Sequence, residues 1–200
     1  MSRIGRGSML AAGVIAVLAG AGTMAYVLSG HGGGPAMPVT VTDPAAALAS
    51  VERDIRRRFP DLVHAEPDGV ARMLGKPDVV VVDVREPAEF AVSRLPGAIR
   101  VDPGIGSDAF VRGFQAIAPG KTFVLYCSVG ERSSRLAARV ATDIKAAGAR
   151  DVVNLSGGIF RWHNERRPLA RAQDASGAVH PYDYNWGRLV DRPKAAPGDN

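Results

Sequence analysis

The fold of this chain is decided by residues 122–134, which read TFVLYCSVGERSS. The first five residues, Thr122–Tyr126, form an apolar run with the length of a buried parallel strand. Apolar residues then recur at helical spacing over residues 133–147, which predicts a helix. Cys127 is the only cysteine among 200 residues, and it therefore lies between the carboxyl end of a strand and the amino end of a helix.

This junction favours a reactive thiol. The unpaired amides and positive dipole end of a helix N-terminus favour an anion, either a thiolate or an oxyanionic substrate. Gly130 permits a tight turn, because glycine adopts backbone angles closed to other residues. Arg132 adds a positive charge to the same loop. A lone cysteine is more often a buried structural residue, but the glycine and the arginine favour a nucleophile here.

Four other segments read as strands: residues 62–64, 79–84, 98–101 and 151–154. Strands that alternate with helical segments imply a parallel sheet covered by helices. We therefore expect an α/β fold with a central, mostly parallel five-stranded sheet and helices on both faces. Ligands of such sheets bind at the carboxyl ends of the strands, where Cys127 lies.

Three further motifs flank the cysteine loop in order. Residues 79–90 read VVVVDVREPAEF, residues 95–99 read LPGAI, and residues 155–162 read LSGGIFRW. Together with a cysteine and an arginine separated by four residues, these motifs resemble the rhodanese-like sulfurtransferase family over residues 62–169. The resemblance implies a single domain with the rhodanese-like fold.

Two positions depart from the family pattern. Arg94 stands where the family often has histidine before its Leu/Ile-Pro-Gly-Ala motif, and Arg166 stands where a small residue usually precedes the closing Pro-Leu. Neither residue lies in the cysteine loop, so we expect them to alter local geometry more than chemistry.

The resemblance also implies a reaction. Four residues between Cys127 and Arg132 suit sulfur transfer, whereas phosphatases and arsenate reductases with similar loops have five. A shorter loop aims its amides at a small sulfur atom, and an added residue widens the cradle for a tetrahedral oxyanion. The Cys127 thiolate would take the outer sulfur of thiosulfate or a related donor, form a persulfide and pass the sulfur to a thiol acceptor.

In this scheme the catalytic residues are Cys127 and Arg132, and Arg132 fixes the loop and attracts the anionic donor. Loop amides would hold the transferred sulfur as an oxyanion hole does, and the substrate-binding residues are Ser128, Val129, Gly130, Glu131 and Ser133. A carboxylate beside the thiol opposes an anionic substrate. If Glu131 points outward it is a solvated charge, and if it points inward it favours cationic or neutral acceptors.

Asp83 and Arg85 are candidate supporting residues. They form either an acid with a charge clamp or a buried hydrogen-bonded turn after the strand, and the need of buried charges for partners favours the turn. The four histidines have no Cys or carboxylate at metal-ligand spacing, so we expect no metal. Neither a dinucleotide fingerprint nor a phosphate loop is present, so we expect no cofactor.

The net charge of +5 does not by itself indicate a nucleic-acid partner. The arginines at residues 56–58 share a predicted helix with Glu52 and Asp54, which favours a solvated charged face. Aromatic residues are not interleaved with basic clusters as a base-stacking surface requires. We expect no nucleic-acid binding.

The N-terminal region predicts a place in the cell envelope. Arg3 and Arg6 precede an uncharged run over residues 9–28, a pattern that directs export of the rest of the chain. Twenty apolar residues can span a bilayer. Residues 1–28 are thus a signal anchor holding the domain outside the cytoplasmic membrane, or a cleaved signal peptide that releases it to the periplasm.

The remaining segments complete the organisation. A tether rich in glycine and proline covers residues 29–42. Asp43 and Pro44 begin an accessory helix within residues 43–61 that ends near Phe59. The rhodanese-like domain covers residues 62–169, and residues 170–200 form a tail. We expect its aromatic stretch to pack against the domain, and the alternative is a strip that binds a partner.

Three functions are consistent with these observations. The first is sulfur transfer through Cys127. The second is a catalytically idle binding module that uses the same pocket. The third is a phosphatase or an arsenate reductase, which the loop length disfavours; for the reductase, the lack of a second cysteine to resolve an intermediate also counts against it.

Overall fold

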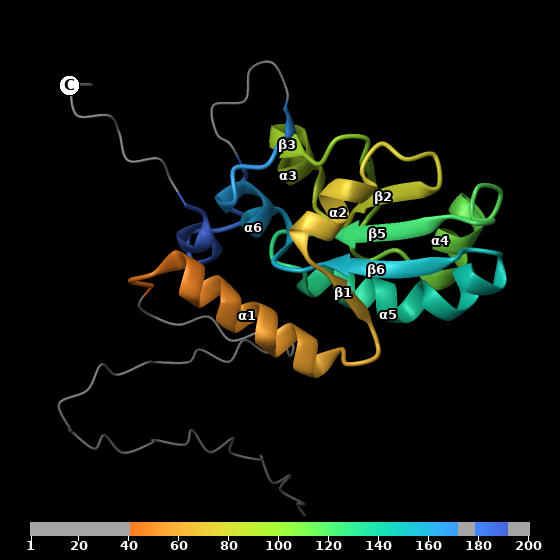
Figure 1. Cartoon of the computed structure of the whole chain (residues 1–200), viewed down its shortest axis with the longest axis horizontal. Helices are drawn as coiled ribbons and strands as arrows, with labels where there is room; N and C mark the ends of the chain where they lie inside the picture. Colours follow the sequence, from red (N-terminus) through yellow and green to blue (C-terminus); the bar gives the residue numbers. More distant parts are fainter. Residues whose placement is uncertain (1–40, 172–178, 192–200) are drawn as a thin grey trace, which may run out of the picture.

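The computed structural model describes residues 41–171 and 179–191. Its centre is a five-stranded sheet in the order β1-β6-β5-β2-β4, and every neighbouring pair is parallel (Figure 1). The strands are β1 (Val63–Ala65), β2 (Val79–Asp83), β4 (Ile99–Arg100), β5 (Thr122–Tyr126) and β6 (Asp151–Leu155). The predicted α/β fold and five-stranded parallel sheet are confirmed.

Helices cover both faces of the sheet, because alternate residues of each strand point to opposite sides. On one face, Val81 and Val124 join a core with α1, α2 and α6. On the other face, Val80 and Phe123 join a core with α4 and α5. The helices are α1 (Pro44–Arg58), α2 (Pro67–Met73), α3 (Pro87–Val92), α4 (Ser107–Phe114), α5 (Glu131–Ala146) and α6 (Gly158–Asn164).

Helix α1 begins and ends where the sequence predicts. The Asp43 carboxylate accepts hydrogen bonds from two amides of the first turn at 2.9 and 3.1 Å, and Pro44 occupies the first helical position. Leu48, Val51 and Ile55 form the buried stripe of the helix, at spacings of three and four residues. The accessory helix is thereby packed onto the domain.

A small second sheet was not predicted. β3 (Ser93–Arg94) and β7 (Ala170–Arg171) form an antiparallel pair, and two-residue strands are too short to show a periodic pattern. The unusual Arg94 belongs to β3 and places its guanidinium over the Phe90 ring. The unusual Arg166 adopts a left-handed conformation with φ of 58° just after α6.

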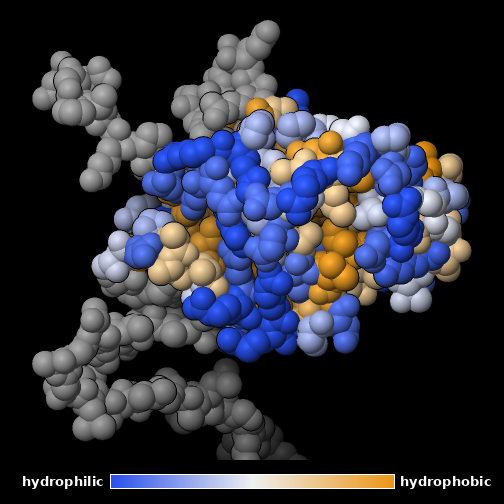
Figure 2. All heavy atoms as spheres, viewed as in Figure 1, coloured by the Kyte–Doolittle hydropathy of each residue, from blue (hydrophilic) through white to orange (hydrophobic). Residues whose placement is uncertain are grey.

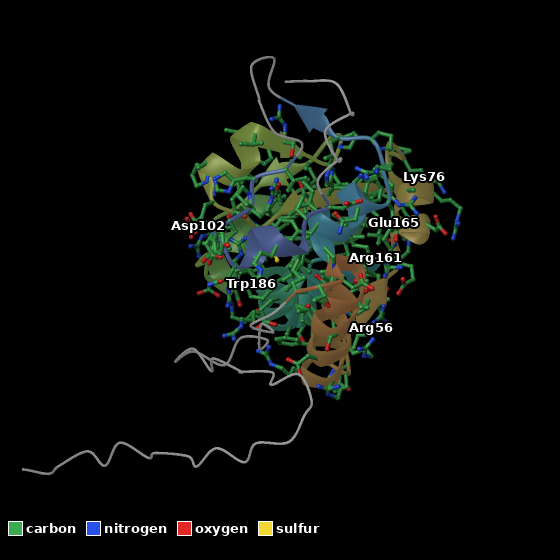
Figure 3. All side chains as sticks on the ribbon, turned by 90° about the vertical axis from the view of Figure 1, so that its left-hand side faces the viewer. Arg56, Lys76, Asp102, Arg161, Glu165 and Trp186 are labelled. Atoms are coloured by element: carbon green, nitrogen blue, oxygen red, sulfur yellow. The ribbon has the colours of Figure 1, made fainter. Side chains whose placement is uncertain are left out.

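The described part of the predicted tail packs against the domain. Val179 and Leu189 are both buried in the core shared with α1. The short 3-10 helix η1 (Trp186–Leu189) lies against α1. The aromatic stretch of the tail is thus held on the end of the domain seen in Figure 3.

The predicted anchor and most of the predicted tether lie outside the described residues. Among residues 41–171 and 179–191, no helix is both long and apolar enough to cross a bilayer.

Charged side chains of the domain surface are extensively paired. Figure 2 shows hydrophilic residues over much of one face, interrupted by hydrophobic ones. In the arginine run of residues 56–58, Arg57 forms an ion pair with Asp54 at 2.8 Å. Arg56 donates to the Ser156 hydroxyl at 2.6 Å. The Arg56 contact therefore joins α1 to the segment after β6, whereas the Arg57 pair lies within α1.

The backbone at the start of α6 supports the cysteine loop. The amides of Ile159 and Phe160 donate to the carbonyl oxygens of Cys127 and Ser128 at 2.9 and 3.0 Å. A Cβ atom at Gly158 would collide with both carbonyl groups, and the residue has φ of 54°. Glycine is therefore required at this contact.

We predict that Gly158→Ala lowers the free energy of unfolding by at least about 2 kcal/mol, because two carbonyl groups of the loop must move. Gly113→Ala in α4 is the matched control, since nothing lies within 4 Å of its Cβ position. That variant should be neutral or about 0.5–1 kcal/mol more stable, because alanine favours a helix. Urea unfolding measures both, and equal stability of the two variants would contradict the proposed contact.

Candidate active site

The thiol lies at the strand–helix junction that the sequence indicated. Cys127 follows β5 directly, and only 1 % of the residue is exposed. The Gly130 amide donates to the Cys127 Sγ atom at 3.2 Å. Gly130 has φ of 101°, which turns the chain into α5. The amide and the helix N-terminus both favour negative charge on this sulfur.

Arg132 is held by a carboxylate from another element. Its two terminal nitrogens donate to Glu89 of α3 at 2.7 and 2.8 Å, and one of them also donates to Ser128 Oγ at 2.9 Å. Ser128 Oγ in turn donates to Glu89 at 2.7 Å. The arginine is thus oriented by an ion pair, and its charge is compensated within the protein.

The pKa values of this pair reflect their contact. Burial is the largest influence on Glu89 and acts to raise its pKa, but hydrogen bonds and charge from Arg132 outweigh it, so the pKa lies below its usual value. Burial is also the largest influence on Arg132 and acts to lower its pKa. The hydrogen bonds and charge of Glu89, together with the nearby Cys127 thiol, outweigh it, so the pKa is raised. Both groups are therefore ionised at neutral pH.

Glu131 is neither a solvated charge nor an unpaired carboxylate facing the thiol. Its oxygens accept from both terminal nitrogens of Arg58 at 2.9 and 2.7 Å. Arg135, one turn further along α5, donates to it at 2.7 Å. The negative charge beside the thiol is balanced by these two arginines.

The other predicted binding residues divide between the pocket and the core. Val129 lies beside the pocket in front of Cys127. Ser133 is buried, and its hydroxyl donates to Asn154 of β6 at 2.6 Å. Its side chain therefore braces α5 against the sheet, which leaves only its backbone for a role in substrate binding.

Asp83 and Arg85 form a buried pair away from the pocket. Arg85 donates to the Asp83 carboxylate at 2.7 Å and to the Ser93 carbonyl at 2.6 Å. The Tyr126 hydroxyl donates to Asp83 at 2.5 Å and accepts from the Leu95 amide at 3.0 Å. Through these contacts the pair connects β2, β5 and the β3 segment. This geometry is that of a buried hydrogen-bonded turn after the strand, one of the two interpretations of the sequence.

A pocket of about 160 Å³ opens in front of the thiol. Its lining includes two aromatic residues of the tail, and Figure 3 shows Trp186 on η1 at the end of the domain turned to the viewer. The lining residues are Cys127, Ser128, Val129, Glu131, Arg132, Tyr182 and Trp186. The sequence patterns do not by themselves place Tyr182, Trp186, Glu89 or Arg58 at the site. Two signals pointed towards them: the aromatic run in the tail, and the need of Arg132 for a buried counter-charge.

The described residues contain no group of three His, Cys, Asp or Glu side chains placed to hold a metal ion. The ring nitrogen Nε2 of His64 lies 3.1 Å from the Phe59 carbonyl oxygen, and that of His163 lies 3.1 Å from the Asp191 carbonyl oxygen. His31 lies outside the described residues.

This arrangement matches a known protein family. The rhodanese-like domain matches residues 66–165, which is half of the chain. This chain belongs to the rhodanese-like family. The match begins just before α2 and ends just after α6, so the rhodanese-like domain includes Glu89 and the whole cysteine loop. It does not include Arg58, Tyr182 or Trp186, which complete the site.

Several relatives of this rhodanese-like domain are named sulfurtransferases. The "Sulfurtransferase" of Allochromatium vinosum is 31% identical over 98 residues, covering 49% of this chain and 84% of that protein. The "Thiosulfate:glutathione sulfurtransferase" of Saccharomyces cerevisiae is 33% identical over 76 residues, covering 32% of this chain and 55% of that protein. The "Probable adenylyltransferase/sulfurtransferase MoeZ" of Mycobacterium tuberculosis is 32% identical over 90 residues, 45% of this chain. The chain spans only 21% of the length of MoeZ.

Two solved structures are similar to part of this chain at lower identity. A rhodanese-like domain protein from Staphylococcus aureus is 23% identical, with a TM-score of 0.42, covering 56% of this chain and 100% of that chain. A rhodanese-related protein from Thermoplasma volcanium is 20% identical, with a TM-score of 0.42, covering 54% of this chain and 97% of that chain.

The Glu89 ion pair predicts a dependence of stability on pH. Because the fold lowers the pKa of Glu89, its ionised form stabilises the fold above the carboxyl's unfolded pKa of about 4.3. That contribution is lost as the pH falls through the lower folded pKa. Glu89→Gln should cost about 2 kcal/mol at pH 7, because Arg132 loses its counter-charge.

The measurement is urea unfolding of wild type and Glu89→Gln from pH 7 down to pH 3. The difference between them should be largest near neutral pH and should shrink below about pH 4. Asp61→Asn, which neutralises an exposed carboxylate after α1, is the control and should track wild type. A difference that is the same at every pH would show that the charge of Glu89 does not stabilise the loop.

Proposed function

We propose that this protein is a sulfurtransferase that moves sulfane sulfur from thiosulfate or a related donor to a thiol acceptor through a persulfide on Cys127. The observation that carries the proposal is the thiol itself. It lines a pocket at the carboxyl end of β5, next to the start of α5. Its sulfur atom accepts a hydrogen bond from the Gly130 amide at 3.2 Å. The sulfurtransferases among its relatives support the same reaction class.

The first half-reaction loads the enzyme. The Cys127 thiolate attacks the outer sulfur of the donor, a new S–S bond forms, and the donor's S–S bond breaks. With thiosulfate, the electron pair of that bond leaves with sulfite. The loop amides of residues 128–133 are the donors proposed to hold the terminal sulfur, as preorganised dipoles stabilise an oxyanion.

The second half-reaction regenerates the thiol. An acceptor thiolate attacks the terminal sulfur of the persulfide, and the Cys127 thiolate leaves with the electron pair of the enzyme's S–S bond. Arg132 lies near the thiol in both half-reactions, and its contact with Glu89 keeps it there. We assign Arg132 the role of stabilising anionic sulfur while it fixes the loop.

Treatment with thiosulfate should add one sulfur atom to the wild-type protein, on Cys127, as measured by intact-protein and peptide mass spectrometry. Cys127→Ser should take up no sulfur and should transfer none to cyanide, because the only thiol is gone. Circular dichroism should show an unchanged fold, since the two side chains have similar size.

Two results would contradict this proposal and favour a different function. A wild-type protein that takes up no sulfur would support an idle binding module. Hydrolysis of an aryl phosphate that is lost in Cys127→Ser would support a phosphatase.

We also propose that residues 1–28 hold the domain at the outer face of the cytoplasmic membrane. The support is the pair of arginines before an uncharged run of twenty residues. The acceptor would then be a thiol delivered to that oxidising compartment.

The full-length protein should sediment with membranes and dissolve only in detergent, whereas a chain lacking residues 1–28 should be soluble. Protease added to spheroplasts should cleave the full-length chain. A soluble periplasmic protein that begins near Tyr26 would refute the anchor and keep export. A full-length soluble protein in the cytoplasm would refute both.

A further inference from the structure

Tyr182 and Trp186, here called the aromatic wall, form one side of the pocket in front of Cys127. Both belong to a segment outside residues 66–165, the part matched by the rhodanese-like family. Most of the surface that faces the pocket is apolar, and Val129 is among the residues that line it. The reaction through Cys127 therefore takes place beside an apolar surface that the family domain does not supply.

The aromatic wall is firmly attached to the domain. Asn164 of α6 donates to the Leu189 carbonyl and accepts from the Asp191 amide, both at 2.8 Å. Leu189 is fully buried. At the other end of the segment, a Cβ atom at Gly187 would lie 2.7 Å from the Pro181 side chain, so the chain doubles back closely on itself. The wall is a built part of the pocket.

Tyr182, which lines the pocket, has an unfavourable backbone conformation. Its φ is 68°, a region that residues with side chains rarely occupy. Its ring lies over the Arg132 guanidinium, 4.8 Å from the ring centre, and its amide donates to His180 Nδ1 at 3.0 Å. Strained backbone conformations persist only where surrounding contacts hold them in place, and they are frequent at ligand sites.

The charges at the pocket are already compensated. Arg132 is engaged by Glu89 on one side and covered by Tyr182 on another. Glu131 is bound by Arg58 and Arg135. A dianionic donor such as thiosulfate would meet no unpaired cation among the described residues that line this pocket, whereas an apolar group would meet aromatic carbon.

The size of the pocket fits one small ring. Its volume is about 160 Å³, and an apolar cavity of about 150 Å³ in another protein holds a benzene molecule. A phenyl or small alkyl group on the sulfonyl sulfur, which leaves with the sulfinate, could therefore lie against the aromatic wall.

We propose that Tyr182 and Trp186 are specificity-determining residues that favour organic sulfane-sulfur donors, in which an apolar group is attached to the reacting unit, over inorganic thiosulfate. This inference rests on the proposed sulfur transfer through Cys127. With an organic thiosulfonate, the Cys127 thiolate takes the outer sulfur, the donor's S–S bond breaks, and its electron pair leaves with the sulfinate. The enzyme persulfide is the same as with thiosulfate.

The test compares benzenethiosulfonate, methanethiosulfonate and thiosulfate as donors to wild-type full-length protein, with cyanide as the acceptor. Wild type should show a higher kcat/KM for benzenethiosulfonate than for thiosulfate, with methanethiosulfonate between them. Tyr182→Gly and Trp186→Ala should each reduce the ratio of benzenethiosulfonate to thiosulfate by about tenfold, the value of one aromatic contact.

Two features of the design separate specificity from folding. Glycine adopts the left-handed conformation of residue 182 without strain, so Tyr182→Gly removes the ring without a backbone penalty. Tyr184→Ala is the matched control, because Tyr184 belongs to the same segment but is 85 % exposed and does not line the pocket. It should leave the ratio unchanged.

Normal persulfide formation with the same donor ratio in wild type, Tyr182→Gly and Trp186→Ala would overturn the inference and leave the proposed function intact. A wild-type preference for thiosulfate would do the same. Failure of all three donors to place sulfur on Cys127 would contradict the proposed function, and the donor preference with it.

Discussion

The carboxylate of Glu89 holds the site together. It joins α3, which follows β2, to the loop that follows β5, across a separation of 43 residues in the chain. The contact is possible because β2 and β5 are neighbours in the sheet. A buried charge is stable only with a partner. Glu89 therefore fixes Arg132 and Ser128 at once, and the shape of the cysteine loop depends on this pair.

The loop is held from its other side by backbone contacts. The first amides of α6 bind the carbonyl oxygens of Cys127 and Ser128, and Gly158 allows the two segments to approach. With its carbonyl groups engaged by α6, the loop keeps the Gly130 amide directed at Sγ. In the proposed sulfur transfer, a dipole fixed in this way would need no rearrangement as negative charge develops, which is the physical basis of electrostatic catalysis.

Segments outside the family match determine the surroundings of the thiol. Arg58 of α1 neutralises Glu131, and Tyr182 covers Arg132. Both residues lie outside residues 66–165. The rhodanese-like domain thus supplies the thiol and its loop. The accessory helix supplies a partner for the charge of Glu131, and the tail supplies aromatic residues that line the pocket.

Local patterns in the sequence determined the secondary structure around the thiol. An apolar run predicts β5, helical periodicity predicts α5, and Asp43 with Pro44 predicts the start of α1, because each depends on residues close together in the chain. Cys127 and Arg132 share a loop for the same reason. The alternation of strands and helices was also sufficient to predict the parallel sheet.

Only the tertiary structure decided what these elements contact. The pairing of β3 with β7 leaves no periodic signal in two-residue strands. The partners of Glu131 and Arg132, and the position of Tyr182 over the pocket, join residues far apart in the chain. Ion pairs and aromatic contacts of this kind depend on distances in space, which the packing of the sheet and its helices sets and which the spacing of residues along the chain does not encode.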